Sequence, residues 1–204
     1  MDILIIAIIV AVAALVLRRQ QERHRISLLA HYLGPFQIEK LMATLSEGYL
    51  RALGENDPQR QQQVWDHLRP NELALCEQFD RFALRFASAD AQRTRVSTLA
   101  LALPWAHQLF PAATFDARKA IAIHAHGIRR AVEAELSVSA KRRAYTLSAE
   151  MFLMQHTCHW FCKSKAVASA RLWARHRTRY EQLLDAVTTD TTRSYRALLG
   201  IHAR

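Results

Sequence analysis

The chain has 204 residues, half of them hydrophobic, and contains only five glycines and five prolines. That length supports one ordinary hydrophobic core, and the scarcity of turn-forming residues excludes an all-β protein with many tight turns. The formal net charge is +10, and residues 103–204 contribute +9 of it through 16 basic and 7 acidic side chains. This uneven positive charge indicates an anionic partner, such as a lipid headgroup, a nucleic acid or an acidic protein surface.

Cysteine and arginine usage indicates the compartment and the type of organism. The three cysteines have no disulfide-like spacing, which is typical of a reducing compartment. Only five of the 28 basic residues are lysine, a skew typical of a GC-rich bacterial genome. We therefore expect a bacterial protein whose folded part lies in a reducing compartment.

An unbroken apolar run, Ile3–Leu17, opens the chain. As a helix it is about 22 Å long, against about 30 Å for the hydrocarbon layer of a bilayer. The arginines that follow can extend the span by snorkelling: Arg18, Arg19, Arg23 and Arg25. We predict a single-pass anchor over residues 1–19 in the bacterial inner (cytoplasmic) membrane. The positive-inside rule places the N-terminus outside and the C-terminal domain in the cytoplasm.

A cleaved signal peptide and a buried core helix are the alternatives for this run. Its length would fit a signal peptide, but no positive side chain precedes it, and the A-x-A match at Ala11–Ala13 lies inside it. A core helix at the domain surface would be amphipathic, whereas this run is apolar on all sides. The membrane anchor is the favoured interpretation.

Behind the anchor we predict a juxtamembrane helix over residues 20–34, which continues from it and ends at the breaker Gly34–Pro35. Residues 35–204 then form a cytoplasmic α-helical domain. No alternating strand pattern of convincing length is found, so the predicted fold class is all-α, with a bundle of six to eight helices.

The first half of the domain shows helical spacing with clear boundaries. Apolar residues at i, i+3, i+4 and i+7 predict a helix from Ile38 to near Gly54. Asp57, followed by proline, predicts the start of the next helix. Pro70 is expected to interrupt this helix and to start another that carries an apolar stripe to Phe86.

Further helices follow in the second half. A cap at Ser88 or Asp90 predicts a helix through Val96 that Pro104 stops, followed by a loop with anchoring aromatic residues over 104–115.

The remaining segments complete the bundle. Thr114 or Asp116 is expected to start a helix that runs to about Glu135. A long helical region then covers residues 140–187, and a short last helix ends at Gly200.

The stretch QHTCHWFC raises the question of a metal site. On a single helix, Cys158 and Cys162 lie within the buried stripe. His159 lies on the shoulder of that stripe, and His156 lies nearly opposite. We favour core packing, in which free cysteine acts as a small hydrophobe, and we expect no cofactor. The alternative is a metal- or haem-binding domain that combines both cysteines with His159 and with His124, a core position of another helix. The spacing lacks both C-x2-C and C-x-x-C-H.

Arg171, Arg175 and Arg179 recur every four residues and predict one basic ridge. The ridge is either a solvated helix face or, together with the arginines behind the anchor, a surface for anionic lipid headgroups or another anionic partner. A nucleic acid is the less favoured partner, because no helix-turn-helix is recognised and the nearby Trp173 and Tyr180 lie towards the apolar stripe.

Small residues between these features suggest a groove for a partner helix at Ser164, Lys165, Ala168 and Ser169. Lys165 falls close to the centre of the apolar stripe, where an unpaired charge is costly. We therefore expect it to have a partner, to lie at a kink, or to be exposed at an unfilled groove.

Enzyme signatures such as G-x-G-x-x-G, G-x-S-x-G and H-E-x-x-H are absent from the sequence, and we expect no enzymatic activity. The favoured function is a membrane-anchored cytoplasmic interaction module: a scaffold, adaptor or accessory subunit of an inner-membrane complex that binds one or more proteins. The alternatives are the metal- or haem-binding domain and a membrane-tethered binder of nucleic acid or anionic lipid.

Overall fold

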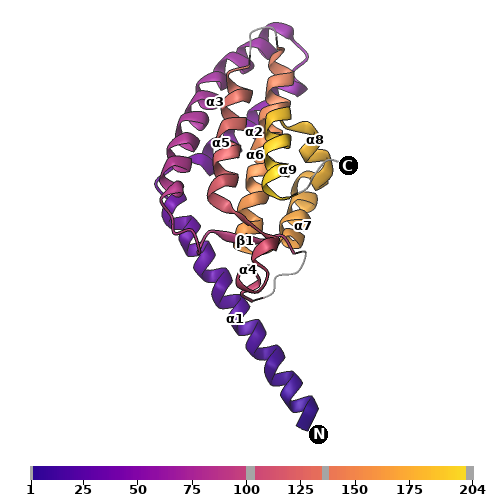
Figure 1. Ribbon diagram of the computed structural model, residues 1–204. Helices are drawn as coiled ribbons and strands as arrows, with labels where there is room; N and C mark the ends of the chain where they lie inside the picture. The colour runs from indigo at the N-terminus through magenta and orange to yellow at the C-terminus, as the bar shows by residue number, and fades with distance from the viewer. Residues whose placement is uncertain (1, 100–103, 135–137, 201–204) are drawn as a thin grey trace.

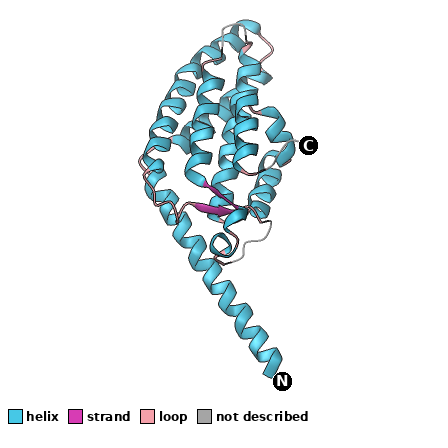
Figure 2. Cartoon of the chain, in the orientation of Figure 1, coloured by secondary structure: helices cyan, strands magenta, loops and turns pink. Residues whose placement is uncertain are grey.

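The computed structural model describes residues 2–99, 104–134 and 138–200 and shows a bundle of helices behind one long N-terminal helix (Figure 1). The predicted all-α class is confirmed. Figure 2 shows that helices make up almost the whole domain, apart from one small antiparallel sheet. In chain order the elements are α1 (Asp2–Leu33), α2 (Ile38–Gly54), α3 (Pro58–Ala87), β1 (Arg95–Ser97), α4 (Ala106–Leu109), η1 (Pro111–Ala113), β2 (Thr114–Asp116), α5 (Ala117–Val132), α6 (Ala140–Cys162), α7 (Lys165–His176), α8 (Tyr180–Ala186) and α9 (Thr189–Leu198).

Helix α1 runs without a break from the apolar run into the bundle, where its second half packs against α3 and α6 (Figure 1). It ends at Leu33, directly before Gly34–Pro35. Among the described helices, α1 is the one that is long and apolar enough to cross a membrane. No residue of its most apolar stretch is buried inside the protein. The apolar run is therefore not covered by the rest of the described chain.

Helix α3 continues through Pro70, so the predicted interruption there is wrong. The carboxylate of Asp57 opens the helix by accepting hydrogen bonds from two backbone N–H groups of the first turn. A proline inside a helix removes one backbone hydrogen bond and crowds the preceding turn. Leu68 and Leu75, on either side of Pro70, are both buried in the core, and their burial keeps the two halves in one helix.

A strand, β1, replaces the helix that the sequence predicts after Asp90. β1 pairs with β2 in antiparallel register, with Val96 opposite Phe115. Both side chains are buried, and the Phe115 ring lies 5.0 Å from the ring of Trp160 on α6. The strand is favoured over the predicted helix because this pairing buries two apolar side chains against α6. The remainder of the predicted helix, residues 100–103, lies outside the described residues.

The helical region predicted over residues 140–187 is broken twice. Helix α6 ends at Cys162, and the Ser164 hydroxyl caps α7 by accepting a backbone hydrogen bond. Helix α7 ends at His176, because Arg177 adopts a left-handed backbone with φ 52°. Helices α7 and α8 consequently fold back onto α6, and one helical wheel does not describe side chains beyond the first break.

Helix α6 is the centre of the bundle. It packs against α5, α7 and α8, and it also contacts α1 and α2. Aromatic side chains join α6 to α3 in the core, where the rings of Phe161 and Phe86 lie 6.1 Å apart. The side of α6 that faces the space between α1 and α7 carries the candidate site described below.

A buried carboxylate in the middle of α3 joins this helix to α2 and to the end of the bundle where α5 ends and α6 begins. Glu72, only 1% exposed, accepts hydrogen bonds from the Tyr49 hydroxyl at 2.8 Å, from Arg69 at 2.9 Å and from Arg143 at 3.2 Å. Arg69 also donates to the backbone carbonyl of Val132 at the end of α5. The network therefore joins four helices through one acidic side chain.

Candidate functional site

Two depressions lie side by side along α6. The first, of about 430 Å³, lies between α6 and α7 and has Phe152 and Leu172 among its apolar lining residues. The second, of about 320 Å³, lies between α6 and the junction of α1 with α2 and is lined mainly by apolar side chains. Both are lined by Gln155, His159 and Arg171, so together they form one groove across the surface of α6, which we call the α6 groove.

The two cysteines of the predicted metal site line the second depression. Both are free thiols that pack against the edge of the core, and the Cys158 sulfur lies 3.7 Å from the sulfur of Met154. Burial raises the pKa of the Cys158 thiol and raises that of Cys162 to about 11, although the nearby Arg25 opposes the latter shift. Both thiols are therefore protonated at neutral pH and behave as small apolar side chains.

His124 is buried in a hydrogen-bonded chain of side chains. Its Nε2 lies 2.8 Å from the hydroxyl of Thr157, which also lies 2.7 Å from the Tyr195 hydroxyl and donates to the Leu153 carbonyl. Because the threonine has one proton and gives it to the carbonyl, it accepts from both neighbours. This arrangement assigns the proton of His124 to Nε2, and burial lowers the pKa of the ring to about 3.

The predicted ligand set is therefore not assembled. Among the described residues, no group of three or more His, Cys, Asp or Glu side chains could hold a metal ion. His124 turns to Thr157, while His159 accepts a hydrogen bond from Arg171 at 3.2 Å through its Nδ1. The structure brings Cys158, Cys162 and His159 to one depression, but it leaves His124 in the core.

His156 lies on the floor of the first depression, although the single-helix analysis places it nearly opposite the buried stripe. It is 1% exposed and stacks on Tyr180 at a ring distance of 4.6 Å. Its Nε2 lies 3.1 Å from the Ser169 hydroxyl. Burial, together with the charge of Lys165, lowers its pKa to about 3. The sequence analysis missed this residue because the break at Arg177, which turns α8 back onto α6, is not visible in the apolar pattern.

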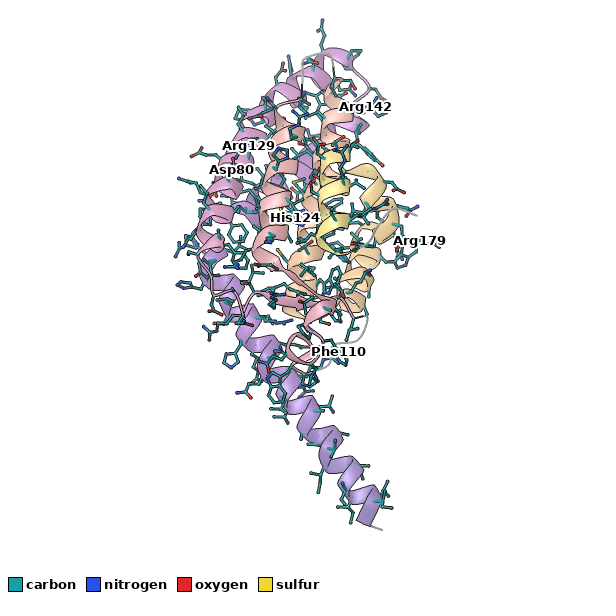
Figure 3. All side chains as sticks on the ribbon, viewed as in Figure 1. Asp80, Phe110, His124, Arg129, Arg142 and Arg179 are labelled. Carbon is teal, nitrogen blue, oxygen red and sulfur yellow. The ribbon has the colours of Figure 1, made fainter. Side chains whose placement is uncertain are left out.

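The predicted basic ridge is divided between two helices. Arg171 and Arg175 lie on α7 and line the first depression. Arg179 instead lies beyond the left-handed Arg177, at the start of α8 (Figure 3). In the described part of the chain, no carboxylate forms an ion pair with Arg171 or Arg175. Two arginines at the groove are thus available to an acidic partner.

The small residues predicted to form a partner groove are mostly engaged inside the domain. Ser164 caps α7 and Ser169 bonds to His156. The Lys165 ammonium lies over the rings of Tyr180 and Trp160, at 4.8 Å and 5.3 Å. Lys165 therefore lies at a break between two helices, and its charge is stabilised by the faces of two aromatic rings. Of the four predicted groove residues, Ala168 lines the α6 groove.

The arginines behind the apolar run have different roles. Arg25 donates to the backbone carbonyls of Arg95 at 2.8 Å and Phe161 at 3.2 Å, and its guanidinium lies over the Phe161 ring. Its assignment to a lipid-facing surface is therefore corrected: Arg25 fastens α1 to the domain. Arg18 pairs with Glu22 along α1, whereas Arg19 and Arg23 are exposed (these are the remaining members of the predicted set).

Comparisons with known proteins give no relative from which a function could be transferred. No family model matches the chain, and neither the curated proteins nor the solved structures contain a match. The α6 groove is therefore interpreted from its own geometry.

Proposed function

We propose that this chain is a single-pass protein of the bacterial inner membrane whose cytoplasmic helical domain binds a partner protein, as a scaffold, adaptor or accessory subunit. The partner would place an amphipathic helix with acidic side chains in the α6 groove. The observation that carries this proposal is the combination of a mainly apolar groove with two arginines, Arg171 and Arg175, that have no carboxylate partner in the described chain.

The anchor supports the membrane part of the proposal. The side chains of the apolar run of α1 are exposed, and a soluble protein would not leave a stripe of this size uncovered. Arginines are concentrated directly after the run, where Arg18, Arg19, Arg23 and Arg25 follow within eight residues. The positive-inside rule then places the domain on the cytoplasmic side.

The chemistry of the groove supports the protein-binding part. An amphipathic helix binds a groove by burying apolar residues spaced three and four apart, and charges at the rim set its orientation. Met42, Met154 and Leu172 supply apolar lining, and methionine adapts its shape to different partners. Glu39 also lines the second depression, at the α2 end. The acidic face of the partner should therefore point towards α7.

Site-specific photo-crosslinking in native membranes tests the proposal. A photoreactive amino acid at Gln155, in the centre of the groove, should give a discrete protein adduct. The same amino acid at Gln63, an exposed position on α3, serves as the control and should not. The double substitution Arg171→Glu and Arg175→Glu should abolish the adduct at Gln155 without changing the circular dichroism spectrum.

Two other results would contradict the proposal. A lipid adduct at Gln155, whose yield falls steeply as salt rises, would assign the arginines to anionic headgroups. Equal adducts at Gln155 and Gln63 would show that the groove has no specific occupant. The proposed partner should instead give a protein adduct whose yield falls only moderately as salt rises, because apolar burial contributes beside the two ion pairs.

A further inference from the structure

An exposed apolar tip lies at the end of the domain nearest the apolar half of α1. It comprises Trp105, Leu109 and Phe110, on and around the short helix α4, with exposed fractions of 47%, 66% and 47%. Figure 3 labels Phe110 close to α1, at the lower end of the domain. The sequence predicts that the aromatic residues of this loop anchor it in the core. Phe115 does so, but Trp105 and Phe110 each leave almost half of their surface exposed.

The tip lies beside the part of α1 that follows the apolar run. A cavity of about 690 Å³ lies between α4 and α1, and it is lined by Trp105, directly before α4, and by Gln108 on α4. On α1 its lining begins at Leu17, the last residue of the apolar run, and continues along the helix to His31. Arg25 of α1 contacts β1, and Figure 1 shows α4 below β1, on the side towards the N-terminus of α1. If α1 crosses a bilayer, α4 is therefore close to the depth at which the chain leaves the hydrocarbon layer.

The length of the apolar run draws this end of the domain towards the lipid. The run is about 22 Å long as a helix, against a hydrocarbon layer of about 30 Å, so a membrane must thin or the flanking residues must approach it. Tryptophan and phenylalanine are favoured at the boundary between headgroups and acyl chains. Arg19, Arg23 and Arg93 are exposed around the same end, where anionic headgroups would attract them.

The local backbone holds the tip in an outward position. Trp105 has a left-handed backbone with φ 52°, which is rare for a bulky residue and marks a conformation that the surrounding structure imposes. Strands β1 and β2 clamp the two ends of the loop, and the Thr98 N–H donates to the Ala113 carbonyl at 2.9 Å. The Trp160 indole donates to the Ser97 carbonyl at 3.0 Å, which fastens the clamp to α6.

We propose that the apolar tip inserts into the interfacial layer of the same bilayer that α1 crosses. This second contact, monotopic and separate from the span, would fix the orientation of the domain, so that the α6 groove keeps a constant angle to the membrane. The inference rests on the membrane anchoring proposed above, but not on the protein partner of the groove.

Tryptophan quenching by lipid tests this proposal on the full chain. The protein is reconstituted in vesicles of phosphatidylglycerol and phosphatidylcholine, with the latter brominated close to the headgroup. Trp105 and Trp173 are equally exposed, at 47%, but Trp173 lies on α7, so the two form a matched pair. Trp173→Phe keeps the tip tryptophan, whereas Trp105→Phe keeps the control, and the buried Trp65 and Trp160 are common to both variants.

In the Trp173→Phe variant the emission should shift to the blue and be quenched several-fold more strongly than in the Trp105→Phe variant. Leu109→Asp, added to the Trp173→Phe variant, should weaken this quenching. Leu109 is 66% exposed, so the substitution removes little packing and should not unfold the domain.

The contrary outcomes separate the two proposals. Equal quenching of Trp105 and Trp173, in a protein that stays in carbonate-washed membranes, would overturn insertion of the tip and leave the anchor intact. Release of the protein by carbonate would overturn both.

Discussion

Arginines at the two ends of the domain have contrasting surroundings. At the end where α5 finishes and α6 begins, Arg69 and Arg143 converge on the buried carboxylate of Glu72. At the α6 groove, Arg171 and Arg175 line a depression, and no carboxylate of the described chain pairs with them. The same residue type therefore stabilises the fold at one end and remains available to a partner at the other.

This contrast distinguishes arginines that stabilise the fold from arginines that are available for binding in a strongly basic chain. A buried carboxylate that already binds several donors makes its arginines part of the core, because removing one member leaves the others unsatisfied. A guanidinium at the surface contributes little to folding, so its loss should affect binding instead. Removing single charges at each end tests this distinction.

The largest effect is expected for Glu72→Ala. The substitution leaves the Tyr49 hydroxyl and two arginines without their acceptor and should lower the free energy of unfolding by about 3–5 kcal/mol. Urea unfolding of the detergent-solubilised full chain, followed by circular dichroism, measures it. Asp80→Ala is the control: Asp80 pairs with Arg129 at the surface at 2.8 Å (Figure 3), so its loss should cost at most about 1 kcal/mol. Equal losses in both variants would remove the contrast.

Arg25 is an intermediate case, in which a guanidinium binds backbone carbonyls instead of a carboxylate. Arg25→Ala should cost about 1.5–3 kcal/mol, as expected for hydrogen bonds from a charged donor. Hydrogen exchange in the second half of α1 should accelerate, because this side chain fastens α1 to β1 and α6. Arg23→Ala, at an exposed position of α1, should leave the exchange unchanged. Unaltered exchange in the Arg25 variant would argue against the fastening role.

Acidification should lower the free energy of unfolding through His156, which lines the α6 groove. Its pKa is lowered from 6.5 to about 3, so between these values the unfolded chain binds more protons than the folded one. The contribution of neutral His156 to the free energy of unfolding is therefore complete above pH 6.5. Between pH 6.5 and about pH 3 it falls by about 1.4 kcal/mol for each pH unit of acidification. His124 adds a similar slope, whereas burial raises the pKa of Glu150, which acts in the opposite direction.

The variant His156→Gln removes this contribution and, with it, the part of the lowered pKa of His124 that the charge of His156 causes, whereas the contribution of Glu150 cancels in the difference from the wild type. The gap between the two stability curves should change with pH between pH 6.5 and pH 4 and be constant above pH 7. Parallel curves across the whole range would show that His156 is protonated as easily in the folded protein as in the unfolded chain.

The smallest effect on folding is expected for Arg175→Ala. Arg175 is exposed and has no carboxylate partner in the described chain, so the free energy of unfolding should change by no more than about 0.5 kcal/mol. The yield of the photo-crosslink at Gln155 should nevertheless fall. A large loss of stability with an unchanged crosslink would reverse the roles assigned to the two ends.

Local signals predicted much of the fold. The breaker at Gly34–Pro35 and the capping residues Asp57 and Asp116 act within about one turn of the chain, and α1 ends or α3 and α5 begin next to them. The apolar run lies inside α1, as its composition predicts. The core position of His124 also follows from spacing on a single helix. These features depend on neighbours in sequence, so they can be read without knowledge of the fold.

The errors arose where distant contacts decide the local structure. Pro70 is tolerated because burial of its neighbours outweighs a missing hydrogen bond, and β1 forms because Phe115 lies opposite Val96. The breaks after Cys162 and His176 move Arg179 away from Arg171. No periodic pattern records such contacts, since each depends on an element far away in sequence.

By itself, the sequence determined the all-α class, an apolar N-terminal helix and the positions at which most helices begin and end, because helix formation and capping are local events. Only the tertiary structure decided which arginines are paired, where His156 lies and that a groove crosses α6. These properties depend on how helices pack, and packing is set by the shapes and charges of side chains that meet across the bundle.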